Sequence, residues 1–362
     1  MKILQATTAI GWSGGTEQCF LLAKYMNDMG YETHILTFRG CELDRRAEKL
    51  GIERVYFPNT KKLSLSEAKK LAEIIEGYDV VNTHISKAHW FVWISSFLAK
   101  KRPAVVYTRR VLYDISPLSA FTKYSINVDG IVGISPEICK KLQKYPILRK
   151  KVYYIPSGIE LDRFYSGEEV ELRKELSIPA DALVVTNVAN FSQVKGHHVL
   201  LPAFKKFLQT TRKKAFLLLV GRDTCGEEST SLIKKYGLDT QVIPLGFRRD
   251  VPRILRATDI FVFPSVKEGL GSSLLQAMAT GRIVVASYTG GIKDYLRHME
   301  NGIAVEPGSV DSLYRGLLTA LENLNNEGMK VSARETAEKF DIKNVARKTL
   351  NLYKELLRAP LS

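Results

Sequence analysis

The stretch Val262-Phe-Pro-Ser-Val-Lys-Glu-Gly-Leu-Gly-Ser-Ser-Leu-Leu-Gln-Ala-Met-Ala-Thr-Gly281 predicts a strand, a glycine loop and a helix in direct succession. The apolar run over 260–263 is typical of a buried strand. Ser272 or Ser273 is expected to begin the helix, and Gly281 to follow its end. Unpaired N–H groups and a positive dipole at a helix start bind phosphate, and glycines let the ligand approach. The stretch therefore predicts a phosphate site in an α/β fold.

The loop within this stretch carries one acid, Glu268. Because a carboxylate accepts hydrogen bonds from sugar hydroxyls, the loop suits a ligand that carries both phosphate and hydroxyl groups. It resembles the donor-binding signature of the GT-B glycosyltransferases related to family 4, in which two acids spaced E-x7-E span the loop and the helix. Glu268 matches the first acid, which in that family faces the donor sugar. We assign the loop that follows it to the same donor site: Gly269, Leu270, Gly271 and Ser272.

The second acid of the signature, which faces the nucleotide ribose in the family, is replaced by Gln276. An amide carries no charge, but it can still bond a ribose hydroxyl as donor or acceptor. Alternatively, Gln276 could form a capping box with Ser273 at the start of the helix. Both roles are consistent with the sequence.

The composition is that of a soluble globular protein with an acidic partner. The chain has 362 residues, enough for two domains, with 45% hydrophobic and 25% charged residues. The net charge of +15 suits nucleic acid, an anionic membrane surface or phosphorylated small molecules. The four cysteines lie far apart without C-x-x-C spacing, which argues against a zinc site or a disulfide framework and fits a reducing compartment.

The sequence gives no indication of a targeting or membrane-spanning segment. Residues 1–10 are too short and too polar for a signal peptide. The longest apolar stretch, 90–99, is about half of the ~20 residues that a spanning helix needs. We therefore expect a cytoplasmic protein, and leave open whether it binds peripherally to the inner face of the cytoplasmic membrane.

Strand-like and helix-like runs alternate along the whole chain, which predicts parallel sheets flanked by helices. With the resemblance, the expected fold class is α/β, with two Rossmann-like doubly wound domains facing across a cleft (GT-B). We place an acceptor-side domain at 1–165 and a nucleotide-sugar-binding domain at 166–340, with a polar, glycine-bearing hinge near 164–170. The resemblance implies that a terminal helix in 341–362 crosses back to the first domain. The expected strands are 2–9, 33–38, 54–57, 79–83, 104–108, 130–134, 152–155, 183–188, 216–220, 241–245, 260–263, 283–286 and 303–305.

In each half of the chain, a glycine-containing loop follows the first strand. Gly14 and Gly15 precede a helix expected to begin at Glu17, a place where phosphate could rest. By resemblance, this pair closes over the donor diphosphate or lines the acceptor side. In the second half, family members commonly have an Arg and then a Lys-Gly that straddle the diphosphate. Lys195 matches the lysine, but Asn190 stands at the Arg position, so Lys195 is expected to stabilise the leaving diphosphate largely by itself.

Further polar residues lie at the expected carboxyl ends of strands, where open α/β sheets bind ligands. By resemblance, the backbone of Phe247 and Arg248 borders the nucleotide base. Arg222 could neutralise phosphate, or it could be an ordinary surface arginine. In the first half, the family usually has a His that contacts the transferred sugar, and this chain has Arg110 there. An arginine suits an acceptor that bears phosphate or carboxylate, or a donor with an acidic sugar.

His84 is the imidazole that could remain at the catalytic centre, although a single His after a strand is as often structural. We include it with Glu268, Lys195 and Arg110 among the candidate catalytic residues. No D-x-D sequence occurs, so neither a metal nor any other cofactor is expected, and the nucleotide sugar is a substrate.

Basic residues concentrate in 100–151, which holds twelve Lys and Arg against three acids, and so nine of the fifteen net positive charges. Aromatic residues lie close by, at 90–97 and 121. Cations beside aromatics suit an anionic bilayer or a phosphorylated lipid acceptor held at it. No nucleic-acid-binding motif occurs, so nucleic acid is not an expected partner, and a solvated basic face without a partner stays open.

The leading hypothesis is a glycosyltransferase that moves a sugar from a nucleotide-diphosphate sugar to a hydroxyl of a glycolipid or polysaccharide precursor. The resemblance is greatest to members that assemble lipopolysaccharide and polysaccharide, and it implies a retaining reaction without a metal. A GT-B phosphorylase or a nucleotide-sugar epimerase would use the same scaffold. A nucleotide-sugar-binding subunit with weakened catalysis is a third possibility, because Asn190, Arg110 and Gln276 depart from the family pattern.

Overall fold

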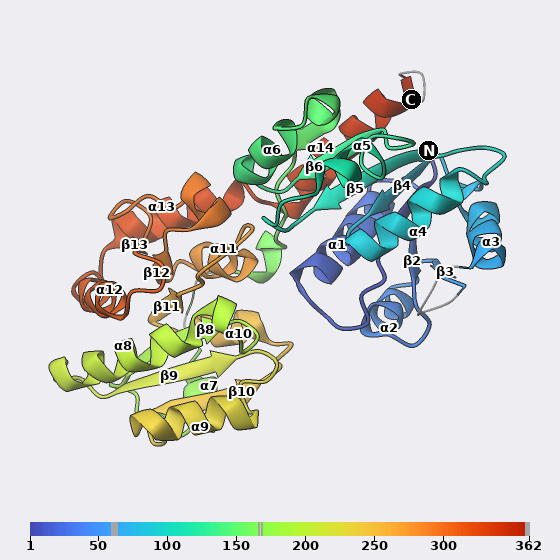
Figure 1. Ribbon diagram of the computed structural model, residues 1–362. Helices are drawn as coiled ribbons and strands as arrows, with labels where there is room; N and C mark the ends of the chain where they lie inside the picture. Colours follow the sequence, from blue (N-terminus) through green and yellow to red (C-terminus); the bar gives the residue numbers. More distant parts are fainter. Residues whose placement is uncertain (59–63, 166, 168, 359–362) are drawn as a thin grey trace. The chain divides into compact units, whose positions relative to one another are not determined.

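The computed structural model of the protein describes residues 1–58, 64–165, 167 and 169–358. The chain divides into two compact units, each described here by itself (Figure 1). Unit 1 comprises Met1–Gly158 and Ile342–Ser362, and unit 2 comprises Ile159–Asp341. The division lies before the expected boundary at 165, because the Ile159 N–H bonds the Phe340 carbonyl and Ile159 pairs with Asp341. Of the expected hinge, residues 166 and 168 lie outside the described residues.

Unit 1 is built on a sheet of seven parallel strands in the order β3-β2-β1-β4-β5-β6-β7. A parallel sheet of this order is the Rossmann-like, doubly wound arrangement that the alternating pattern predicts. The strands are β1 (Ile3–Ala6), β2 (Thr33–Thr37), β3 (Arg54–Tyr56), β4 (Val80–Thr83), β5 (Ala104–Arg109), β6 (Gly130–Gly133) and β7 (Val152–Tyr154).

Successive apolar residues of these strands enter cores on opposite faces of the sheet, as the period of two requires. Ile3 packs with α1 (Gly14–Asp28) and α14 (Ile342–Arg358) on one face. Leu4 packs with α3 (Leu65–Ile75) and α4 (Ser86–Ser96) on the other (Figure 1). The remaining helices of the unit are α2 (Glu42–Lys49), α5 (Pro117–Phe121), α6 (Pro136–Gln143) and the 3₁₀ helix η1 (Pro146–Lys151).

The C-terminal helix α14 belongs to the core of unit 1. Its buried Tyr353 and Leu352 pack with Ile3 of β1 and Met26 of α1. Tyr353 is fully buried, and its hydroxyl accepts a hydrogen bond from Gln5 Nε2 at 3.3 Å. The last helix of the chain therefore completes the first unit.

The start of α1 differs from the sequence-based expectation. Ser13 adopts extended backbone, and its hydroxyl accepts a hydrogen bond from the Thr16 N–H, which makes Ser13 the N-cap. Gly14 and Gly15 consequently form the first turn of the helix, and the expected start at Glu17 is wrong. The glycine pair lies in the part of a helix where backbone N–H groups have no intrahelical acceptor.

Unit 2 is built on six parallel strands in the order β10-β9-β8-β11-β12-β13. They are β8 (Leu183–Val188), β9 (Ala215–Val220), β10 (Val242–Gly246), β11 (Ile260–Phe263), β12 (Ile283–Ser287) and β13 (Ile303–Val305). All thirteen expected strands thus form, and the fold is α/β with two Rossmann-like sheets.

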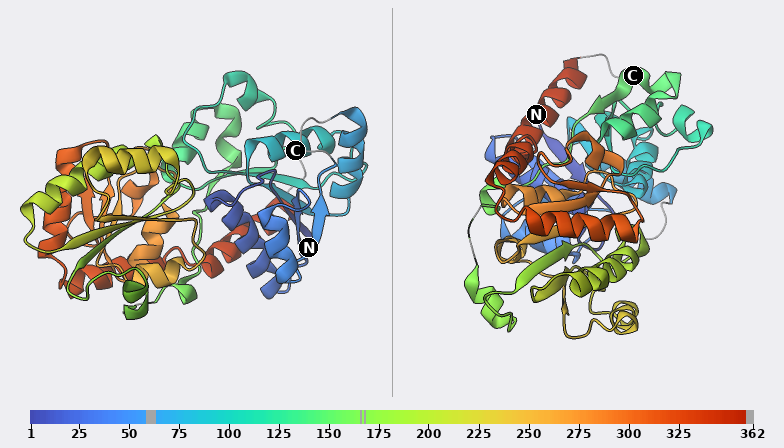
Figure 2. Two further views of the ribbon diagram at one scale, coloured as in Figure 1. Left: turned by 90° about the horizontal axis from the view of Figure 1, so that it is seen from below. Right: turned by 90° about the vertical axis from the view of Figure 1, so that its left-hand side faces the viewer.

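Helices cover both faces of the second sheet as well (Figure 2). Val185 packs with α8 (His197–Thr210) and α12 (Val310–Glu322). Val184, the preceding residue, packs with α7 (Val170–Glu175) and α10 (Val251–Arg256). The remaining helices are α9 (Glu227–Tyr236), α11 (Ser272–Ala279), α13 (Glu327–Glu338), η2 (Leu161–Arg163), η3 (Gln193–Lys195) and η4 (Gly290–Asp294).

Candidate active site

The ammonium of Lys195 and the carboxylate of Glu268 meet at the carboxyl-end edge of the unit 2 sheet. Lys195 ends η3 after β8, and Glu268 lies in the loop after β11. These strands are hydrogen-bonded neighbours, so their loops run side by side. Lys195 Nζ donates to Glu268 Oε2 at 2.5 Å, and Glu268 Oε1 accepts from the Gly269 N–H at 3.0 Å. The lysine side chain is 30% exposed and the glutamate side chain 15%, so both are accessible to a ligand.

A glycine allows the two loops to approach this closely. Gly196, directly after Lys195, has φ +75°, and a Cβ there would lie 2.0 Å from the Pro264 carbonyl oxygen. The Val266 N–H also donates to the Val194 carbonyl at 2.8 Å. A side chain at position 196 would therefore separate the two loops that carry Lys195 and Glu268.

The loop of Glu268 is braced from the side of β12. The Thr289 hydroxyl donates to the Val266 carbonyl at 3.0 Å, and the Gly291 N–H donates to the Glu268 carbonyl at 3.3 Å. The buried Tyr295 hydroxyl donates to the Leu270 carbonyl at 2.6 Å. Burial, with a smaller effect of the Glu268 charge, raises the pKa of Tyr295, so the hydroxyl keeps its proton. These three bonds fix the backbone on both sides of the carboxylate.

Helix α11 follows the Glu268 loop, and no side chain caps its N-terminus. Its N-cap is Gly271 at φ +82°, which has no side chain to accept hydrogen bonds from the first turn. Ser272 therefore opens the helix with its N–H groups available for an anion. Gly281 follows the helix end at φ +70°, which confirms the expected termination.

Gln276 does not form the capping box that was one of its two expected roles. The hydroxyl of Ser273 instead donates to the Val188 carbonyl at 2.9 Å, and Ser273 is not the N-cap. The Gln276 side chain is half-buried and has no hydrogen-bond partner among the residues that the structure describes. It is available to a ligand hydroxyl.

The loops after β8 and β9 are joined through Asn190. Its Oδ1 accepts from the Arg222 N–H at 3.1 Å. Gly221, at φ +148°, lets the loops touch, since a Cβ there would lie 2.1 Å from the Ala189 carbonyl oxygen. Asn190 thus holds the loop backbone. The exposed guanidinium of Arg222 has no ion pair within the described ranges of the chain.

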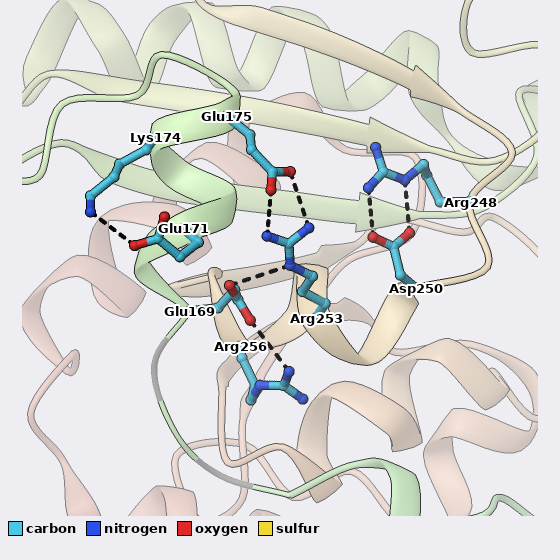
Figure 3. A network of polar contacts seen from close by, with 8 residues as sticks. All are labelled: Glu169, Glu171, Lys174, Glu175, Arg248, Asp250, Arg253 and Arg256. Carbon is cyan, nitrogen blue, oxygen red and sulfur yellow. Dashed lines mark hydrogen bonds and ion pairs between the residues drawn. The ribbon is translucent and has the colours of Figure 1, made fainter.

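The guanidinium of Arg248 is occupied by an acid two residues away (Figure 3). Its Nε and Nη2 donate to the two carboxylate oxygens of Asp250 at 2.8 and 2.5 Å. This bidentate pair raises the pKa of Arg248 and lowers that of Asp250. The Arg248 side chain is therefore fixed by Asp250. A nucleotide base could contact the exposed Phe247 and the backbone of this loop.

Beside that pair, an ion-pair network ties α10 to α7 and to the residue before it (Figure 3). Arg253 contacts Glu175 at 2.7 Å and Glu169 at 3.3 Å, and Arg256 contacts Glu169 at 3.4 Å. The network thus holds α10, the helix that follows the Arg248 loop, against α7.

Unit 1 has its own cavity of about 570 Å³ at the carboxyl ends of β1, β4 and β5. Its lining includes Ser13 and Gly15 at the start of α1, His84 after β4 and Arg110 after β5. A Cβ at Gly15 would lie 3.4 Å from Arg110 Cδ, so the glycine packs against the arginine stem. Gly14 lies beside it in the same turn but does not line the cavity.

His84 has partners on both ring nitrogens. Nε2 lies 2.8 Å from Gln5 Oε1, which only accepts, so Nε2 carries the proton. Nδ1 then accepts from Arg110 Nη2 at 3.1 Å. The ring is 2% exposed, and burial, with the Arg110 charge second, lowers the pKa of His84 well below 6.5. Both ring nitrogens of His84 are therefore engaged, Nδ1 by the guanidinium of Arg110, and a catalytic role for His84 stays a prediction.

Several residues of these sites were missed by the sequence analysis. Tyr295, which braces the Glu268 loop, has no local signal because its partner lies 25 residues away. Arg109 and Lys123 both line the unit 1 cavity. They belong to the basic run over 100–151, but only the fold shows which cations of that run point into a cavity.

The described residues contain neither a cluster of metal ligands nor a membrane-spanning helix. No three His, Cys, Asp or Glu side chains in the described part of the chain lie together in a way that could hold a metal ion. Among the same residues, every helix is too short or too polar to cross a membrane.

The sheets define an α/β fold, and comparisons with known proteins give the class of enzyme. The model of the glycosyl transferases group 1 matches residues 168–340, and that of glycosyltransferase family 4 matches residues 12–163. The chain belongs to the glycosyltransferases that these two models describe. It is therefore an enzyme that transfers sugars from nucleotide sugars.

Individual relatives match over much of the chain. The N-acetyl-alpha-D-glucosaminyl L-malate synthase of Bacillus anthracis is 24% identical over 97% of this chain and 95% of its own. The UDP-Gal:alpha-D-GlcNAc-diphosphoundecaprenol alpha-1,3-galactosyltransferase of Escherichia coli is 26% identical over 75% of each chain. The crystal structure of Anabaena Alr3699/HepE in complex with UDP and glucose superposes with a TM-score of 0.88, at 22% identity, over 98% of this chain and 100% of that one. This last likeness concerns the fold, which is GT-B.

Proposed function

We propose that the protein transfers a sugar from a nucleotide-diphosphate sugar to a hydroxyl of a glycolipid or polysaccharide precursor, as in lipopolysaccharide core assembly. The proposal includes retention at the anomeric carbon and no need for a divalent ion. The observation that carries it is the Lys195–Glu268 pair beside the uncapped start of α11. One ammonium and a row of backbone N–H groups suit a diphosphate, and the adjacent carboxylate suits sugar hydroxyls.

In the proposed reaction, the bond between the anomeric carbon and the β-phosphate oxygen breaks as the acceptor oxygen bonds to the same carbon. The acceptor proton passes to the leaving diphosphate. Lys195 and the N–H groups of α11 stabilise the charge that develops on that diphosphate. Glu268 orients the sugar by accepting hydrogen bonds from its hydroxyls. Gln276 and Arg222 are assigned to the ribose and to a phosphate, respectively.

The name of one relative supports the acceptor class, because the Escherichia coli galactosyltransferase is named for a sugar on diphosphoundecaprenol. Among exposed apolar side chains of unit 1, Leu118 and Phe121 on α5 are 73% and 59% exposed. Helix α5 contacts η1, whose last turn carries Arg149, Lys150 and Lys151. We assign this apolar and basic face to the surface of an anionic membrane, at which a lipid-linked acceptor would be held.

The test is to incubate the protein with a panel of nucleotide sugars, with and without lipid-linked and soluble acceptors, and to measure the free nucleotide. A glycosyltransferase releases nucleotide only with an acceptor. Sugar 1-phosphate formed with inorganic phosphate would indicate a phosphorylase, a changed nucleotide sugar would indicate an epimerase, and binding without turnover would indicate a binding subunit. Activity in excess EDTA and the anomeric configuration of the product, by NMR, test the metal and retention claims.

A further inference from the structure

The unit 1 cavity is lined by three cations, Arg109, Arg110 and Lys123, none of which has a carboxylate partner within the described residues. Its one acid, Asp114, has a side chain that is 75% exposed and pairs with Lys141 at 3.4 Å. A cavity of about 570 Å³ is large enough for a ligand of the size of a sugar phosphate. The imbalance of charge indicates that the occupant is an anion.

Arg110 is the most informative of these cations, because the protein holds it firmly and leaves it incompletely paired. Nη1 donates to the Ser157 hydroxyl at 2.5 Å and Nη2 to His84 Nδ1 at 3.1 Å. Both partners are neutral, and Nε is buried without any partner. Burial lowers the pKa of Arg110 to about 10, so the guanidinium is still charged at neutral pH. Two neutral partners do not compensate a buried charge, whereas an anion would.

A buried network fixes the direction of Arg110. Asn82 Nδ2 and His84 Nε2 both donate to Gln5 Oε1, at 3.2 and 2.8 Å. The Thr108 hydroxyl donates to Asn82 Oδ1 at 2.9 Å. These residues come from β1, β4 and β5, or directly follow them. The sheet therefore fixes the position of the His84 imidazole, which accepts the hydrogen bond from Arg110. Such preorganisation is typical of a binding group.

We propose that the acceptor substrate carries a phosphate or carboxylate group, and that Arg110 and Lys123, which both line the unit 1 cavity, bind this group. The inference rests on the proposed transferase function and names its acceptor class. The diphosphate of the donor is assigned to Lys195 and α11 of unit 2, so the anion in unit 1 is a separate group. The hydroxyls of Ser13, Ser86 and Ser119, also in the lining, suit the sugar or polyol part of the same acceptor.

The experiment measures the affinities of glucose, glucose 6-phosphate and a polyprenyl-diphosphate-linked sugar in detergent micelles for the full chain by calorimetry. The variants are Arg110→Gln and Lys123→Gln, with Arg45→Gln as the matched control, because Arg45 belongs to the same unit, has a side chain that is 63% exposed and does not line the cavity. UDP affinity is measured for each. We expect the wild type to prefer a phosphorylated ligand over glucose by at least about tenfold, which is ~1.4 kcal/mol. Arg110→Gln should abolish that preference and Lys123→Gln should reduce it severalfold, while Arg45→Gln should leave it unchanged and UDP affinity should be the same in all variants.

A preference confined to the lipid-linked sugar assigns the anion to a lipid headgroup, and a preference shared by glucose 6-phosphate assigns it to a soluble acceptor. Equal affinity for glucose and the phosphorylated ligands, or a preference that survives Arg110→Gln, would overturn the inference. If Arg110→Gln does not fold, Lys123→Gln is the test, because Lys123 is half-buried: a preference for phosphorylated ligands that is unchanged in this variant would overturn the inference. Failure of UDP to bind would instead count against the proposed function, and would leave an Arg110-dependent preference standing.

Discussion

The ammonium nitrogen of Lys195 lies 2.5 Å from Oε2 of Glu268, across the loops that follow β8 and β11. Both groups are partly buried, and each is the other's charged partner in the described structure. A donor diphosphate would compete for the ammonium, and the sugar hydroxyls would compete for the carboxylate. Ligand binding would thus exchange one charge-assisted contact for two.

Removing either charge should affect turnover more than folding. We expect Lys195→Met and Glu268→Gln each to lower kcat by about 10²–10³-fold, as for loss of one group that stabilises developing charge. Lys195→Met should also weaken UDP binding by about tenfold, because hydrogen bonds to charged groups contribute ~1.5–3 kcal/mol. Steady-state nucleotide release and calorimetry measure both effects. Lys213→Met, at an exposed position in the same unit, is the control, and unchanged turnover in Lys195→Met would refute its catalytic assignment.

The contact of Gly196 with Pro264 makes a second prediction. Gly196→Ala would place a methyl group 2.0 Å from a carbonyl oxygen, so the two loops must separate. Gly237→Ala is the matched control, because Gly237 also has positive φ but has nothing within 4 Å of its Cβ position. We expect Gly237→Ala to reduce the free energy of unfolding by about 1–2 kcal/mol without changing UDP affinity. Gly196→Ala should reduce the free energy of unfolding by more than this and should also weaken UDP binding. Urea unfolding and calorimetry measure the two effects. Equal effects of the two changes would show that loop contact is unimportant.

Three buried histidines make the stability depend on pH. Burial lowers the pKa of His89 and His197 to about 4 and that of His84 well below 6.5. Above pH 6.5 the folded and unfolded chains are equally unprotonated at these sites. As the pH falls from 6.5 toward 4, the unfolded chain binds protons that the folded chain does not. The free energy of unfolding should therefore fall, by about 1.4 kcal/mol per pH unit for each histidine.

Urea unfolding at several pH values measures this slope, and one variant isolates a single site. His89 lies 2.7 Å from the Lys123 carbonyl and stacks on Tyr107. His89→Gln keeps a hydrogen-bond donor but cannot titrate, so it should reduce the slope by the equivalent of one proton. His198→Gln, at an exposed position, should leave the slope as in the wild type. A wild-type slope in His89→Gln would mean that His89 is protonated when folded.

Much of the fold could be predicted because the information is local. Short apolar runs at the right spacing predicted every strand. The start of α1 was missed because a single hydroxyl decides it. Ser13 caps the helix through its hydrogen bond from the Thr16 N–H. From sequence alone, two adjacent glycines after a serine are typical of a loop.

The candidate site was predictable only where strand order determines it. Lys195 and Glu268 follow strands that a Rossmann-like order places side by side, so their approach could be anticipated. The cavity cations could not, because Arg109 ends β5 and Lys123 follows α5, and only the fold brings both into the lining of one cavity. The role of His84 also depended on tertiary context, since burial and the guanidinium of Arg110 together lower its pKa.

The apolar and basic face of α5 and η1 yields the last prediction. Vesicles that contain phosphatidylglycerol should sediment the protein at low salt, and salt should release it, because screening shortens the reach of the charges. Phe121→Asp should weaken binding by removing an exposed ring and adding a repelled charge. Lys150→Gln should weaken it by about fivefold, from ~1 kcal/mol per basic residue near an anionic surface. Lys213→Gln in unit 2 keeps the net charge of Lys150→Gln and should bind as the wild type does. Equal losses in the two lysine variants would show that overall charge, and not this face, drives the association.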